Sequence, residues 1–134
     1  MKYLIYVIAA FMLASCSSDS FPTNKWYGKH LTVVEMTGTP VQTSGSTSDA
    51  HLIFNSENGV INGSGGCNRI FGQYALDRKN AIRFSEIGAT KMACQNMDFE
   101  NRFLDLLDQV RYYEFKDNMM LLKNGSKDVI LKLQ

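Results

Sequence analysis

Three cysteines are the residues of this 134-residue chain whose chemistry depends most on their surroundings. Cys67 and Cys94 are 27 positions apart, and no Cys-His signature of a catalytic thiol surrounds either of them. Two cysteines without clustered histidines do not complete a tetrahedral zinc site, and His30 and His51 each stand alone in the sequence. A disulfide is therefore the first interpretation of this pair, a catalytic thiol is the alternative, and no metal site is predicted.

The third cysteine, Cys16, follows a segment typical of a secretion signal. Residues 1–3 form a short basic segment through Lys2, and residues 4–13 form an apolar run of ten residues. Such a run is too short for a membrane-spanning helix, which needs about 20 apolar residues. The sequence Leu13-Ala14-Ser15-Cys16 resembles the bacterial lipobox, which implies cleavage before Cys16 and acylation of its thiol. The alternative is an ordinary signal followed by an unrelated cysteine.

A lipid on Cys16 would fix where the chain resides. Residues 16–24 are polar and contain one proline, as expected for a lipid anchor and a short tether. Ser17, rather than an aspartate, follows Cys16. This resembles the sorting pattern of outer-membrane lipoproteins. We therefore expect residues 1–15 to be a lipoprotein signal, and the protein to lie in the bacterial cell envelope, lipid-anchored in the outer membrane.

Lipidation also changes the cysteine count from odd to even. Cys67 and Cys94 would remain in an oxidising compartment, where cysteines pair. A disulfide that closes a loop of this length is expected to stabilise the fold by about 3–4 kcal/mol.

The rest of the chain, residues 25–134, is long enough for one domain with a modest core. Removal of the signal takes one lysine and leaves 13 cationic side chains against 13 acidic ones. This balance argues against nucleic-acid binding, which usually needs a basic patch. We expect a monomer.

Short β-branched or alternating segments separated by turn residues predict strands. The predicted strand segments are 26–36, 51–55, 60–63, 70–76, 81–87, 110–116, 119–123 and 129–133, and residues 37–49 form a long loop. Asn58-Gly59 is a strong turn signal because both residues tolerate positive φ. The three strands up to residue 87 form an antiparallel meander.

One segment changes to a helical period. The apolar residues Phe99, Phe103, Leu106, Leu107 and Val110 form a stripe, and Glu100, Arg102, Asp105 and Asp108 fall outside it. This predicts one amphipathic helix over 97–110 that covers the sheet, with Asn96 and Asp98 as caps. The fold class is therefore mainly β (α+β): an antiparallel curled sheet or partly open barrel of about seven strands with one helix.

A glycine cluster separates two of the predicted strands. Gly63, Gly65 and Gly66 permit positive φ and close backbone approach, and Asn68 can fix the corner by bonding nearby backbone groups. A phosphate-binding loop is the alternative, but it needs a following helix and a Lys-Ser/Thr pair, and a strand follows here.

An ordered set of motifs runs through the chain, and it resembles the META domain family, which includes HslJ-like heat-shock lipoproteins. The matching residues are Trp26, Gly65-Gly66-Cys67-Asn68, Gly72-Gln73-Tyr74, Thr90-Lys91-Met92-Ala93-Cys94 and Glu100. The resemblance covers roughly residues 25–133 and implies a cracked β-barrel with one helix in an envelope or secreted protein linked to stress response. It implies structural roles for these residues, and Thr90 and Glu100 could bond backbone donors at the helix entrance.

The resemblance supplies no catalytic residues, and the chain lacks a Gly-x-Ser-x-Gly motif or a metal cluster. We therefore expect a non-enzymatic envelope lipoprotein without a cofactor, active in envelope maintenance or stress response. The alternative is a pilot-like barrel module that binds a peptide or hydrophobic ligand in its opening.

Overall fold

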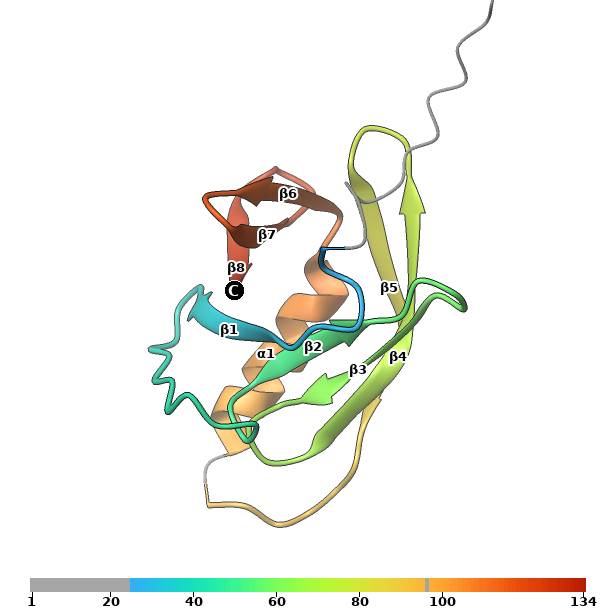
Figure 1. Cartoon of the computed structure of the whole chain (residues 1–134). Helices are drawn as coiled ribbons and strands as arrows, with labels where there is room; N and C mark the ends of the chain where they lie inside the picture. The colour runs from blue at the N-terminus through green and yellow to red at the C-terminus, as the bar shows by residue number, and fades with distance from the viewer. Residues whose placement is uncertain (1–24, 96) are drawn as a thin grey trace, which may run out of the picture.

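The computed structural model of the chain describes residues 25–95 and 97–134 (Figure 1). The predicted signal, the lipid-bearing Cys16, the tether and the predicted cap Asn96 lie outside these residues.

Eight antiparallel strands and one helix make up the fold of the described residues, with one strand for each strand segment named from the sequence and close to the overall count of about seven. In chain order the elements are β1 (Leu31–Met36), β2 (His51–Phe54), β3 (Val60–Ser64), β4 (Arg69–Asp77), β5 (Ala81–Ala89), α1 (Met97–Gln109), β6 (Tyr112–Lys116), β7 (Met119–Lys123) and β8 (Val129–Leu133). Each strand pairs with the next, and β8 returns to β1. The predicted mainly β class and the meander are confirmed.

The ring of strands is closed unevenly. β4 and β5 pair along almost their whole lengths, whereas β5 and β6 share a single register pair, Ala81 with Tyr112. β1 and β2 share only two register pairs. The sheet is therefore a curled, irregular barrel, which matches the predicted partly open form.

The turn between β2 and β3 differs in detail from its prediction. Only Gly59 has a positive φ, of 66°, and Asn58 does not share it. Asn58 instead accepts a hydrogen bond from Val60 N through its side chain, and Asn55 N donates to Val60 O. The connection is a longer turn held by asparagine side chains, because these can replace missing backbone partners.

Helix α1 follows the predicted apolar stripe. Phe103, Leu106 and Leu107 are buried, and Val110 is buried directly after the helix, while Phe99 is half-buried. Asp98 lies inside the first helical turn, so its predicted place as a cap before the helix is wrong; its charge still suits the positive end of the helix dipole. Across the described ranges, no helix is long and apolar enough to cross a membrane.

Apolar side chains from the strands and α1 fill the interior of the barrel as one cluster. The largest fully buried members are Phe54, Phe103, Leu52, Ile61, Ile70, Ile82, Leu106, Leu107, Met120, Leu122, Leu131 and Leu133. Alternation along the strands produces this core: in β4 the inward residues are buried and the outward ones exposed.

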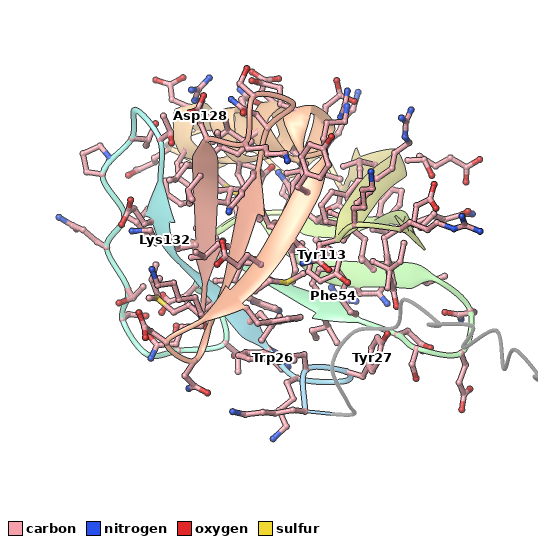
Figure 2. The ribbon with its side chains drawn as sticks, turned by 90° about the horizontal axis from the view of Figure 1, so that it is seen from above. Trp26, Tyr27, Phe54, Tyr113, Asp128 and Lys132 are labelled. Atoms are coloured by element: carbon pink, nitrogen blue, oxygen red, sulfur yellow. A yellow bond between two sulfur atoms is a disulfide. The ribbon has the colours of Figure 1, made fainter. Side chains whose placement is uncertain are left out.

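The up-and-down order gives the barrel two distinct ends. Lys25 donates to Asn118 in the β6–β7 turn, and Gly28 N donates to Phe54 O at the end of β2. Figure 2 shows Trp26 and Tyr27 at this edge, with Phe54 close by. In Figure 1 the β3–β4 turn and the segment before α1 lie at the opposite end.

Candidate functional site

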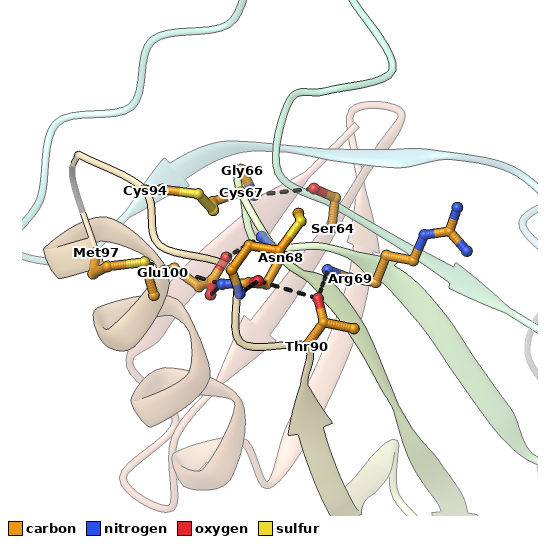
Figure 3. Close-up of a disulfide and its surroundings, with 10 residues drawn as sticks. Ser64, Gly66, Cys67, Asn68, Arg69, Thr90, Cys94, Met97 and Glu100 are labelled. Atoms are coloured by element: carbon orange, nitrogen blue, oxygen red, sulfur yellow. Dashed lines mark hydrogen bonds between the residues drawn. A yellow bond between two sulfur atoms is a disulfide. The ribbon is translucent and has the colours of Figure 1, made fainter.

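A disulfide joins two of the motifs. Cys67 lies in the β3–β4 turn and Cys94 in the segment between β5 and α1, and the structure bonds their sulfurs (Figure 3). Their Cα atoms are 6.3 Å apart, within the range of about 4.4–6.8 Å for native disulfides. The predicted pairing is therefore present in the structure, and it ties the glycine corner to the entry of the helix.

Asn68, the next residue, is only 1% exposed and connects three parts of the chain. Its side-chain oxygen accepts hydrogen bonds from Met92 N at 2.6 Å and from Thr90 Oγ1 at 3.1 Å. Its backbone carbonyl accepts from Gly65 N at 2.8 Å. The corner is therefore closed by the backbone of Asn68, whereas its side chain, predicted to bond nearby backbone groups, instead holds the segment that carries Cys94.

Glu100 faces Asn68 from the first turns of α1, and it is 2% exposed. One carboxyl oxygen accepts from the Asn68 side-chain amide at 2.6 Å, and the other accepts from Asn68 N at 2.7 Å. The prediction that Glu100 lies outside the buried helix face is wrong. Gly65 makes room for it, because a Cβ there would lie 2.5 Å from Glu100 Cγ.

Thr90 completes this network (Figure 3). Its hydroxyl donates to Asn68 and accepts from Arg69 N at 3.0 Å. Thr90 and Glu100 therefore do bond backbone donors, but these donors belong to Asn68 and Arg69 at the start of β4. The helix entrance, where they were expected, does not supply them.

Two further motif residues lie away from this network. Trp26 is buried and stacks on Phe115 at a ring-centroid distance of 4.7 Å. The Tyr74 hydroxyl donates to Asn55 O at 2.8 Å, and burial, with a smaller contribution from Tyr27, raises the pKa of Tyr74 above its usual range. Both residues secure the end of the barrel where Lys25 lies.

Two open grooves flank the disulfide. One, of about 750 Å³, lies between the β1–β2 loop, the glycine corner and the start of α1, and both cysteines line it. The other, of about 610 Å³, lies over β2, β3 and β4 and includes Cys67 but not Cys94. The glycine corner thus separates two surface depressions of the size that small ligands occupy, about 300–1,000 Å³.

The network itself offers little for chemistry. Cys67 and Cys94 are oxidised, and the polar atoms of Asn68, Thr90 and Glu100 are bonded to one another or to backbone groups. Within residues 25–95 and 97–134, no three histidine, cysteine or acidic residues are grouped to hold a metal ion. The arrangement therefore fixes backbone geometry.

Sequence reasoning missed a histidine pair and the grooves. The rings of His30 and His51, expected to stand alone, are tilted against each other at 4.5 Å, and His51 Nδ1 bonds to Asp49 O. The groove over β2, β3 and β4 includes Arg69 and Phe71. In the sequence, the one sign of their role is that both lie at outward positions of β4.

Solved structures share this fold. The NMR structure of a protein from Burkholderia xenovorans matches with a TM-score of 0.60 and 22% identity, over 79% of this chain and 77% of that chain. A second NMR structure matches with a TM-score of 0.59 and 20% identity, over 79% of this chain and 88% of the other. A crystal structure of a DUF4847 family protein from Bacteroides vulgatus ATCC 8482 matches less well, with a TM-score of 0.48, 23% identity, and coverage of 63% and 57%.

Comparison with curated proteins finds no match. The sequence model of the META domain matches residues 24–134, which include the whole described barrel. The motifs that carried the resemblance lie within this range, and three of them, residues 65–68, residues 90–94 and Glu100, meet around one disulfide. The chain belongs to the META domain family.

Proposed function

We propose that this chain is a non-catalytic lipoprotein of the bacterial cell envelope, anchored in the outer membrane through Cys16, with a role in envelope maintenance or stress response. The observation that carries the non-catalytic part is the closed network around Asn68. Its hydrogen-bond partners are Glu100, Thr90, Met92 N and Gly65 N. The polar groups of these family motifs are therefore used in hydrogen bonds that hold the fold. The anchor rests on Leu13-Ala14-Ser15-Cys16.

The two ends of the barrel support a consistent orientation. The described chain begins at Lys25, beside the β6–β7 turn, and the disulfide corner lies at the other end (Figure 1). Eight residues separate Cys16 from Lys25, and they span at most about 29 Å when fully extended. A lipid on Cys16 would therefore keep the Lys25 end near the membrane and present the disulfide end to the aqueous space.

A second candidate is a binding module for a protein segment or hydrophobic ligand. The two grooves of about 610 and 750 Å³ beside Cys67 favour it. Such a ligand would bind on the outside of the barrel and not in its opening, because apolar side chains fill the interior. Cross-linking in intact envelopes followed by pull-down would identify a bound partner.

Metabolic labelling with radioactive palmitate tests the anchor. The wild-type chain should incorporate label and fractionate with the outer membrane, and the Cys16→Ser variant should do neither. Ser17→Ala keeps the acceptor cysteine and serves as the matched control, with labelling equal to wild type. Equal labelling of wild type and Cys16→Ser would disprove lipidation at this residue.

A further inference from the structure

The groove over β2, β3 and β4 has a regular floor. Register pairing aligns Ile53, Asn62 and Phe71 across the three strands in one row. The adjacent row contains Ser64 and Arg69, which face each other across β3 and β4. Arg69 and Phe71 are alternate residues of β4, so both point outward, about 7 Å apart along the strand.

The groove also has walls. Thr47 and Ser48 of the β1–β2 loop border it on one side, Gly66 and Cys67 on another, and Thr90 lies at its end. The disulfide and the Asn68 network hold two of these walls in place. The depression of about 610 Å³ is thus a formed site, of a size typical for small-molecule ligands.

The charge of the lining is one-sided. Among the described residues that line the groove there is no lysine, aspartate or glutamate, so Arg69 is the one permanently charged side chain, and His51 is the other titratable group. Within the described part of the chain, the Arg69 guanidinium makes no hydrogen bond or ion pair; its backbone N–H donates to the Thr90 hydroxyl, and its carbonyl accepts from Thr90 N. A free guanidinium bordered by hydroxyl groups is suited to a carboxylate or phosphate, which it binds with two parallel hydrogen bonds.

Phe71 supplies an apolar surface next to this cation. Its side chain is 48% exposed, although most large apolar residues of the barrel are buried. The ring lies across the backbone of Gly88, where a Cβ would come within 2.6 Å of a ring carbon. The ring is therefore fixed on the sheet, and its outer face is available for stacking.

We propose that this groove binds a small anionic molecule that carries a flat apolar group, with its carboxylate or phosphate on Arg69 and its apolar group on Phe71. The two side chains leave β4 about 7 Å apart, and the long, flexible arginine side chain lets one small ligand contact both the guanidinium and the ring. The proposal does not depend on lipidation or on the non-catalytic role.

Four probes test this on the isotopically labelled, full-length protein purified in detergent micelles, followed by NMR. Benzoate and phenyl phosphate carry both groups, and they distinguish carboxylate from phosphate recognition. Acetate carries only the charge, and benzyl alcohol only the ring. We expect saturable shifts of the Arg69, Phe71 and Thr90 amides with one or both of the complete probes, at affinities at least about tenfold higher than with either half, because each half loses one of the two contacts.

Variants assign the two contacts. Arg69→Gln should weaken binding of the complete probe at least about tenfold and abolish the salt dependence of that binding. Phe71→Leu keeps an apolar side chain over Gly88 and should weaken binding of the complete probe severalfold. Arg83→Gln is the matched control, since Arg83 is an exposed arginine of β5 outside the groove, and its affinity should equal wild type. Absence of saturable shifts in the groove, or equal affinity in Arg69→Gln and Arg83→Gln, would overturn the proposal.

Discussion

Asn68 is the residue on which the motifs of this family converge. It contacts the glycine corner, the segment before α1 and α1 itself, and its partners on these three elements are up to 32 positions away in sequence. The sequence suggested only a local role at the corner, because the capacity of an asparagine for local backbone bonds can be inferred without knowing the fold. Helical periodicity likewise predicts that its partner Glu100 lies outside the buried face of α1. A charged residue is assigned to solvent unless a buried hydrogen-bond donor for it is known.

Removal of the Glu100 side chain tests this network. Glu100→Ala leaves Asn68 N without an acceptor in a buried position and leaves its side-chain amide with only the long contact to Met97 Sδ at 4.0 Å, at about 1–3 kcal/mol for each donor. We expect the free energy of unfolding in urea to fall by about 3 kcal/mol. Asp105→Ala, on the exposed side of α1, is the control and should change it by less than about 0.5 kcal/mol. Equal stability of the two variants would contradict the role of Glu100.

Asp49 makes the stability of the β1–β2 loop depend on pH. The hydrogen bond from the Ser44 hydroxyl, together with those from the Ser44 and Gly45 amides, holds the pKa of Asp49 below its usual value. Because the folded pKa is the lower one, the stabilisation of this loop is fully present above the usual aspartate pKa and is lost as pH falls through the folded value.

NMR titration of the Ser44 and Gly45 amides should therefore show an acid transition below the usual aspartate range. The transition should vanish in Asp49→Asn and persist in the control Asp117→Asn, which alters an exposed turn elsewhere. A midpoint at or above the ordinary value would show that these bonds do not form in solution.

At the scale of elements, the sequence predicted most of the strands and the helix to within two residues. β7 and β8 match their predicted ranges, and α1 ends one residue early. These segments follow local signals: an apolar stripe of helical period for α1, and short apolar runs for β7 and β8, bounded by turn residues such as Asp117 and Asn118, both of which adopt positive φ. The grooves could not be predicted, because they depend on how the β1–β2 loop lies over distant strands.

The disulfide should act on the segment between β5 and α1. Replacement of both Cys67 and Cys94 by serine is expected to lower the free energy of unfolding by about 3–4 kcal/mol, from the entropy of the opened loop. Met92 N and Thr90 would keep their bonds to Asn68, so the fold should persist while amide exchange rises in residues 91–95. An unchanged urea midpoint, or two free thiols in unreduced wild-type protein, would refute the bridge.

For the whole molecule, the main expectation is that the domain has no catalytic activity. The motif residues around the disulfide are bonded to one another and to backbone groups, and the oxidised cysteines offer no thiolate nucleophile. A broad screen with esterase, peptidase and phosphatase substrates should show no turnover by the purified chain. Turnover that disappears in Cys67→Ser or Cys94→Ser would instead establish the catalytic thiol considered from the sequence.

The pairing of β1 with β8 has a consequence for the order of folding. Lys132 and Glu35, which bridge these strands, are 97 positions apart, whereas β2 to β5 are joined by short turns. Local pairings form faster than distant ones, so the meander should assemble first and the barrel should close last. β1 has only two register pairs with β2, and its other partner is the final strand. During synthesis from the amino terminus, β1 therefore keeps an exposed edge until β8 has been made, and we expect the chain to be most prone to aggregation in this interval.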